Sequence, residues 1–236
     1  MKLKWPDRGK KGETMQYDFD YISKNDERVQ KLYRDMENCL LHTQSRLWDC
    51  FSFRFEPVGS FARNMVTYDR NSKVGFDLDF DIELMKEADG YTPKEIKDLF
   101  RRTFDAFNYF RGYKHAEDST RVITVKKVNV FIGTVECSCD YAITRTITDR
   151  KGKKRKQYIH FNKTKQEYTW QLQSDGQCLL PEKEKWIKRL GGWNELRDCY
   201  LEKKNNNDDT DLHSRSLYAQ AVHEVCQRHH YYEKGK

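Results

Sequence analysis

The stretch that decides the fold is an acidic run with strict alternation, Phe76-Asp77-Leu78-Asp79-Phe80-Asp81-Ile82-Glu83-Leu84. Because successive side chains of a β-strand point to opposite faces, this period of two predicts a strand with one apolar and one acidic face. Asp is disfavoured in strands, and like charges about 7 Å apart on one face repel each other. The acidic face is therefore costly unless something positive lies over it.

A divalent cation is one candidate for the positive group. Hard ions such as Mg²⁺ prefer carboxylate oxygens together with phosphate oxygens. Two such ions can bridge the attacking and leaving oxygens of a phosphoryl or nucleotidyl transfer. The alternative is an amphipathic edge strand whose acidic face is simply solvated.

A Gly-Ser pair upstream of the strand favours the metal interpretation. Gly59-Ser60 follows a β-like run over residues 51–55 and precedes Asp77 by 17 residues. A Gly-Ser turn that opens a helix presents backbone N–H groups and a hydroxyl to a phosphate. The pair alone carries no signal, but Gly-Ser followed by an Asp-x-Asp strand is much more specific.

A third carboxylate lies on a later predicted strand, residues 135–143. By alternation Asp140 shares a face with Ser138, away from the apolar residues between them. If this strand lies beside the first, Asp140 joins Asp77 and Asp79. Three carboxylates would then hold two metal ions, with Asp140 also placed to activate an acceptor hydroxyl.

The remaining patterns predict an α/β (α+β) protein. Helices are expected over residues 26–50 and 92–110, where Thr92-Pro93-Lys94-Glu95 forms a capping box. Strands are expected over 121–130, 134–148 and 158–161, with residues 149–156 as a turn. From residue 180 the pattern is helical again, with helices over 193–205 and from 214 onward.

The order of these features resembles a known family. Gly59-Ser60, then Asp77-x-Asp79, then a lone Asp140 is similar to the polymerase-β-like nucleotidyltransferase superfamily. Residues 26 to about 205 most resemble the branch of oligoadenylate synthases and bacterial cGAS/DncV-like nucleotidyltransferases. The resemblance implies a nucleotidyltransferase-type mixed β-sheet flanked by helices. Residues 1–165 would form the catalytic core with its N-terminal helix, and residues 166–236 a small helical C-terminal lobe.

The resemblance also implies roles for single residues. Gly59 and Ser60 would contact the nucleotide triphosphate, and the metals would be Mg²⁺ or Mn²⁺, bound by Asp77, Asp79 and Asp140. Lys203 stands where related enzymes carry a phosphate-binding lysine, although Lys204 or a merely solvated helix end fits the pattern too. The chain departs from the branch in three respects: it is short, its C-terminal lobe is reduced, and Asp81 offers an alternative Asp79-x-Asp81 register.

The activity expected on these grounds is transfer of a nucleoside monophosphate from an NTP to a hydroxyl, with release of pyrophosphate. The acceptor would be a second nucleotide, giving a linear or cyclic oligonucleotide signal. A toxin-like minimal nucleotidyltransferase that modifies RNA or protein is the alternative. A hypothesis from another class is a non-catalytic nucleic-acid-binding module with structural carboxylates.

The net charge of +7 is unevenly distributed. Residues 1–12 carry +4 and residues 150–156 carry +6, so the rest of the chain carries −3. The two basic segments are candidates for contact with RNA or another polyanion, with a solvated tail and hairpin tip as the alternative.

Other features exclude whole classes of protein. A content of 14% aromatic residues predicts a folded core, and the absence of a run of about 20 apolar residues excludes a membrane span. The first residues lack the apolar region of a secretory signal, and seven scattered cysteines suit reduced thiols, so a cytoplasmic location is expected. Cys137 and Cys139 are expected to fill a core. A zinc site at His223, Cys226 and His230 is less favoured than a solvated helix end.

Overall fold

The computed structural model describes residues 18–70, 75–131, 133–174, 180–209 and 212–231. The chain divides into two compact units. One comprises residues 20–179 and contains the sheet, and the other comprises residues 1–19 with 180–236 and contains the last helices. In this division residues 166–174 lie in the same unit as the sheet.

Strands and helices follow the predicted order. The strands are β1 (Phe19–Tyr21), β2 (Phe53–Val58), β3 (Thr67–Asp69), β4 (Phe76–Leu84), β5 (Glu117–Asp118), β6 (Val122–Asn129), β7 (Thr134–Thr148), β8 (Lys154–Asn162) and β9 (Glu167–Leu172). The helices are α1 (Glu27–Leu47), α2 (Gly59–Ala62), the 3₁₀ helix η1 (Lys86–Gly90), α3 (Pro93–Asn108), α5 (Leu180–Arg189), α6 (Trp193–Asn205) and α7 (Ser214–Arg228).

Within the described residues, seven strands form one mixed sheet. Five of them lie in the order β2-β4-β7-β6-β5, and β8 pairs with β7 and with β9. The acidic strand β4 runs antiparallel to β2 and parallel to β7. Strand β7 is 15 residues long, so its first part pairs with β4 and β6 and its last part continues into a hairpin with β8. The mixed sheet expected from the sequence is confirmed.

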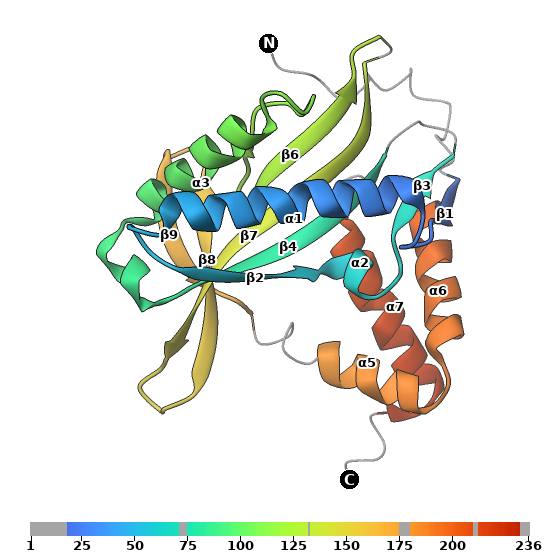
Figure 1. Ribbon diagram of the computed structural model, residues 1–236. Coiled ribbons are helices and arrows are strands. Elements are labelled where there is room, and N and C mark those ends of the chain that lie inside the picture. Colours follow the sequence, from blue (N-terminus) through green and yellow to red (C-terminus); the bar gives the residue numbers. More distant parts are fainter. Residues whose placement is uncertain (1–17, 71–74, 132, 175–179, 210–211, 232–236) are drawn as a thin grey trace. The chain divides into compact units, whose positions relative to one another are not determined.

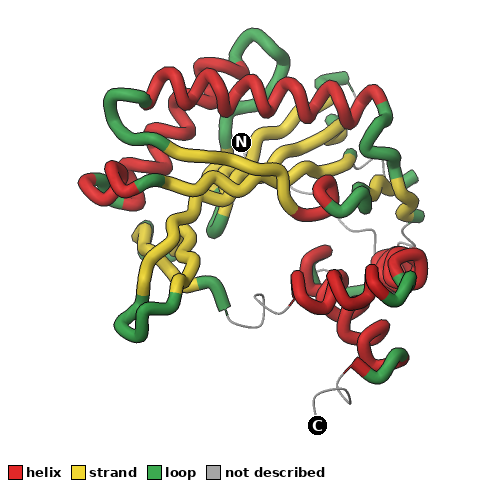
Figure 2. Tube along the Cα trace, turned by 60° about the horizontal axis from the view of Figure 1, so that its bottom comes forward, coloured by secondary structure: helices red, strands yellow, loops and turns green. Residues whose placement is uncertain are grey.

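Helices α1 and α3 lie on one face of this sheet (Figures 1 and 2). The apolar side chains of the acidic strand point toward them, and Leu78 and Ile82 are fully buried. Tyr141 of β7 is also fully buried, in ring contact with Phe80 and Phe104. Burying each side chain of this size stabilises the fold by about 1.5–3 kcal/mol. The apolar face of β4 is therefore fixed against the helices, which leaves the carboxylates on the opposite face.

The two helices begin where the sequence predicts. Asp26 caps α1 by accepting a hydrogen bond from the backbone N–H of Arg28 at 2.9 Å. At α3 the Thr92 hydroxyl accepts from the backbone N–H of Glu95, while the Glu95 carboxylate accepts from that of Thr92. These contacts satisfy N–H groups that have no partner inside the helix.

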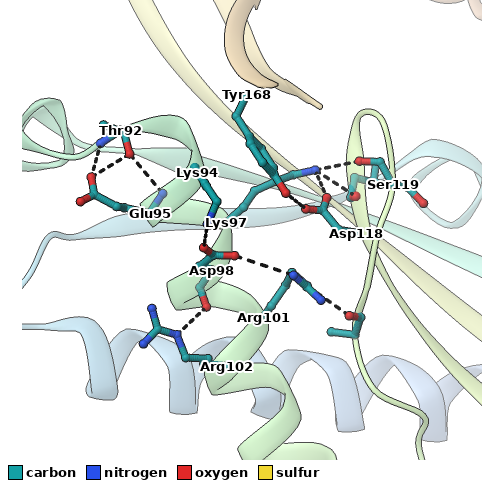
Figure 3. Close-up of polar contacts among 12 residues, drawn as sticks. Thr92, Lys94, Glu95, Lys97, Asp98, Arg101, Arg102, Asp118, Ser119 and Tyr168 are labelled. Atoms are coloured by element: carbon teal, nitrogen blue, oxygen red, sulfur yellow. Dashed lines mark hydrogen bonds and ion pairs between the residues drawn. The ribbon is translucent and has the colours of Figure 1, made fainter. Parts of the chain in front are cut away.

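Strand β9 joins the sheet by pairing with β8, and a cluster around the buried Lys97 adds a side-chain link (Figure 3). Lys97 of α3 is fully buried, and its Nζ donates to Asp118 Oδ1 at 2.6 Å and to the carbonyl of Ser119 at 2.8 Å. The hydroxyl of Tyr168, in β9, donates to the other oxygen of Asp118 at 2.7 Å. Burial lowers the pKa of Lys97, and the ion pair with Asp118 opposes this shift. Residues after 165 are thus tied to α3 and β5.

The predicted turn over residues 149–156 is shorter in the structure. Only residues 149–153 form the turn, where Asp149 accepts from the backbone N–H groups of Lys151 and Lys153. Residues 154–156 belong to β8 because they pair with the end of β7. This places Lys156 opposite Thr146 rather than in a loop.

The second unit contains helices at the predicted positions. The side chains that α6 and α7 bury include Leu196, Val222 and Val225. Charged side chains cross between the two helices, such as Lys203 with Glu224 at 2.5 Å. Among the described helices, none combines the length and the apolar character needed to cross a lipid bilayer.

Candidate active site

The site is built on the acidic face of β4 where it runs beside β7. The parallel register sets Asp77 opposite Ser138 and Asp79 opposite Asp140. Side chains at paired positions of neighbouring strands lie on the same face. The structure therefore places the three predicted aspartates on one face of two adjacent strands, although Asp140 lies 61 residues after Asp79 in the sequence.

Gly59 packs directly against this group. Strand β2 ends at Val58, which is paired with Asp79, and Gly59 follows with a φ of +64°. A Cβ atom on Gly59 would lie 2.1 Å from Asp79 Oδ2, so only glycine fits. Ser60 follows in the first turn of α2. The predicted Gly-Ser turn and Asp79 are therefore neighbours in space.

Asp140 is half-buried and receives a hydrogen bond from a strand on its other side. The hydroxyl of Thr124, in β6, donates to Asp140 Oδ1 at 2.6 Å. Burial raises the pKa of Asp140 to about 6; the Thr124 hydrogen bond opposes the shift and the charge of Asp77 adds to it. A carboxylate with this pKa is a better proton acceptor than an ordinary aspartate.

Asp77 is the most exposed of the three aspartates. The hydroxyl of Ser138, its partner in the register, donates to Asp77 Oδ1. Asp77 and Asp140 are thus each held by one hydroxyl from a neighbouring strand.

The other carboxylates of the acidic strand have cationic partners. Asp81 accepts from Thr144 at 2.9 Å and forms an ion pair with Lys156. Glu83 accepts from Thr146 at 2.6 Å and pairs with Arg54 at 2.7 Å.

At this end of the strand the protein itself supplies the positive charge that the sequence pattern required. Partial burial opposes ionisation of Glu83, but hydrogen bonds from Thr146 and Arg54 outweigh it and lower its pKa. Because Asp81 is engaged by Lys156, the geometry favours Asp77-x-Asp79 over the alternative register with Asp81. The Lys156 pair could not be predicted from sequence pattern, because it arises from the β7–β8 register. A surface hollow of about 260 Å³ lies beside the pair, over Arg54, Glu56 and Glu83.

The three aspartates have the chemistry of a site for a hard divalent cation. Within the described ranges, no three His, Cys, Asp or Glu side chains are already grouped as a metal-binding cluster, and His223, Cys226 and His230 are no exception. Carboxylate oxygens from Asp77, Asp79 and Asp140 are nevertheless the donors that Mg²⁺ prefers, and the missing Cβ of Gly59 leaves room for the Asp79 carboxylate itself.

The remaining predicted residues lie elsewhere. Lys203 is in α6, and a hydrogen bond with Glu224 raises its pKa. The neighbouring Lys204 is buried, and its Nζ lies 4.0 Å from the ring centroid of Phe19. Of the pair, Lys203 is the lysine at the surface. Basic residues 1–12 lie outside the described residues. Cys137 and Cys139 are buried, as expected for core residues.

Comparison with known proteins identifies the fold. No protein-family model matches the sequence, and no curated protein matches it. Solved structures do match, and they are nucleotidyltransferases of the cGAS/DncV-like type. The fold predicted from the resemblance is therefore confirmed.

Three of these structures illustrate the likeness. The CdnE c-UMP-AMP synthase of Rhodothermus marinus, with Apcpp and Upnpp, has a TM-score of 0.54 at 12% identity over 85% of this chain and 71% of that one. The CdnE cyclic dinucleotide synthase of Elizabethkingia meningoseptica, with GTP and Apcpp, has a TM-score of 0.50 at 11% identity, over 86% and 70%. The GTP-bound form of Vibrio cholerae DncV has a TM-score of 0.52 at 14% identity, over 84% and 51%. At identities this low, the structural likeness shows a shared fold and nothing more.

Proposed function

We propose that this protein is a metal-dependent nucleotidyltransferase that transfers a nucleoside monophosphate from an NTP to a hydroxyl and releases pyrophosphate. The observation that carries the proposal is the placement of Asp77, Asp79 and Asp140 on one face of two adjacent parallel strands, with the Gly59 turn packed against Asp79. The likeness to CdnE and DncV synthases supports it.

The chain's own groups have distinct tasks in this reaction. Gly59 and Ser60 hold the triphosphate, and Lys203 is proposed as a further phosphate contact. Asp140 accepts the proton of the acceptor hydroxyl, whose oxygen bonds to the α-phosphorus as the bond to pyrophosphate breaks. Asp77, Asp79 and Asp140 would hold Mg²⁺ or Mn²⁺, which when bound neutralises the charge of the phosphates.

The acceptor is proposed to be a second nucleotide, so that the product is a linear or cyclic oligonucleotide signal. The support is the likeness to enzymes described as cyclic dinucleotide synthases. An RNA end or a protein hydroxyl is the alternative acceptor, and the non-catalytic nucleic-acid-binding module is the alternative class.

Labelled NTPs with Mg²⁺ or Mn²⁺ test the enzyme hypothesis directly. Wild type should release pyrophosphate, and Asp77→Ala with Asp79→Ala should abolish the release. If wild type and the double variant are equally inert while RNA binding persists with a steep salt dependence, the protein is a binding module instead. Mass spectrometry of products from NTPs alone decides the acceptor, because a signal synthase gives oligonucleotides without any macromolecule.

The basic hairpin between β7 and β8 is proposed to contact a polyanion such as RNA. Arg150, Lys151, Lys153 and Lys154 are exposed there, and the hairpin extends from the end of β7 (Figure 1). Replacing these four residues by Gln should weaken RNA binding and flatten its salt dependence without lowering thermal stability. A cytoplasmic location, suggested by the scattered cysteines of the sequence, completes the proposal.

A further inference from the structure

Each of four carboxylates on the acidic face receives a hydroxyl hydrogen bond from a neighbouring strand. Two of them, Asp81 and Glu83, also pair with a cation. The other two, Asp77 and Asp140, belong to the proposed metal site. The donors and acceptors are Ser138 to Asp77, Thr124 to Asp140, Thr144 to Asp81 and Thr146 to Glu83.

We propose that Thr124 is a positioning residue of the active site, which fixes the Asp140 carboxylate so that its second oxygen faces the reacting groups. This inference rests on the proposed function and deepens it. Thr124 touches neither substrate nor metal in this scheme and acts only through Asp140. It was not among the residues singled out by sequence pattern, because β6 carries no motif.

The geometry of Thr124 suits this role. Thr124 is the register partner of Asp140 across β6 and β7, it is 8% exposed, and its hydroxyl lies 2.6 Å from Asp140 Oδ1. A charge-assisted hydrogen bond of this length constrains the rotamer of a carboxylate. Oδ1 accepts from the Thr124 hydroxyl, and in this proposal Oδ2 is the oxygen that approaches the acceptor or the metal.

The backbone beneath Thr124 is also fixed. The buried Lys97 donates to the carbonyl of Ser119 and lies 3.4 Å from that of Val122, at the start of β6. Strand β6 is paired with β7 along its whole length, with a register shift only after Lys127. A side chain on such a strand can hold its partner with little loss of precision.

The chain offers a matched control at the other end of the acidic face. Thr146 donates to Glu83 at 2.6 Å, the same distance as Thr124 to Asp140. Glu83 is paired with Arg54 and has no place in the proposed chemistry. Thr124→Val and Thr146→Val therefore remove the same kind of hydrogen bond from the same face, one inside the site and one outside it.

The experiment measures steady-state pyrophosphate release for wild type, Thr124→Val, Thr124→Ser and Thr146→Val, together with thermal unfolding of each protein. Thr124→Val should lower kcat by about 10- to 100-fold with KM changed less than about 3-fold. Thr124→Ser should restore most of the loss, and Thr146→Val should stay near wild type. If Thr124→Val and Thr146→Val lose the same activity, or Thr124→Ser fails to rescue a folded protein, the inference is wrong.

A second measurement separates this inference from the proposed function. Binding of Mn²⁺ with a non-hydrolysable ATP analogue, followed by electron paramagnetic resonance, needs no turnover. Mn²⁺ should bind Thr124→Val several-fold more weakly than Thr146→Val. Equal affinities overturn the role of Thr124 even in an inactive protein, whereas failure of wild type to release pyrophosphate counts against the proposed function.

Discussion

The two ends of the acidic strand differ in how their carboxylates are balanced. Toward its end, Asp81 and Glu83 are neutralised within the protein by Lys156 and Arg54. At its beginning, Asp77 is followed on the same face by Asp79, which is paired in register with Asp140 of β7. Burial of Asp140 opposes its ionisation and raises its pKa. The carboxylates of one alternating pattern thus have different neighbours at the two ends of the strand, and the proposed metal site lies at its beginning.

This difference shows that an acidic strand does not by itself specify a metal site. The neighbouring strands determine which carboxylates form ion pairs with the protein's own lysine and arginine side chains. Strand β8 supplies Lys156 to one end, whereas β7 supplies a further aspartate to the other. The proposed function requires that the two ends respond differently to the same substitution.

The largest expected effect is that of Asp79→Asn. Removing one charge from the central carboxylate should lower pyrophosphate release by at least about 10³-fold, because the carboxylates would hold the metal ions. Thermal stability should be unchanged or higher, since one of several like charges is removed. Asp81→Asn is the matched variant at the other end, and equal activity losses for the two would erase the distinction between them.

Gly59→Ala should have the next largest effect. A Cβ there would meet Asp79 Oδ2 at 2.1 Å, and the φ of +64° adds backbone strain. Displacing the carboxylate should cost about 10²-fold in activity. Gly152→Ala is the control, because Gly152 has a φ of +76° and a Cβ added there would have no neighbour within 4 Å. Gly152→Ala should cost stability only, and an equal loss of activity there would mean that strain rather than the clash is responsible.

Asp81→Asn should act on stability more than on chemistry. Weakening the partly buried pair with Lys156 should lower the free energy of unfolding by about 1–3 kcal/mol. Urea titration measures this loss, and activity should stay within a few-fold of wild type. The double variant Asp81→Asn with Lys156→Met should recover part of the stability. A single variant as stable as wild type would show that the pair contributes nothing.

The smallest expected effect is a gain in stability for Asp140→Asn. The folded-state pKa of Asp140, about 6, lies above the ordinary value near 3.9, so its neutral form stabilises the fold below about pH 4. That contribution is lost as the pH rises through 6, because ionisation is penalised by burial. In EDTA, Asp140→Asn should therefore raise Tm at pH 8 by about 2–4 °C, which corresponds to roughly 1 kcal/mol in the free energy of unfolding. Near pH 4 the variant should leave Tm unchanged. The same Tm difference at both pH values would contradict this linkage.

Much of the fold follows from local sequence patterns. The 3.6-residue periodicity and caps predicted α1 and α3, and strict alternation predicted β4 and the facing of Asp140 on β7. These signals are short-range, since they arise from backbone hydrogen bonding and from which side of each element is apolar. Strand β9 was not predicted, because its place depends on antiparallel pairing with β8 and on the contact of Tyr168 with Asp118, which is distant in sequence.

By itself, the sequence determined that one face of residues 76–84 would be acidic and that a Gly-Ser turn and a third aspartate would accompany it. Only the tertiary structure decided that Asp79 lies beside Asp140, that Gly59 packs against Asp79, and that Asp81 forms an ion pair with Lys156. The physical reason is that alternation fixes the face of each side chain, whereas strand order and register fix its neighbours. Register is set by packing of the whole sheet against α1 and α3, which no single stretch of sequence contains.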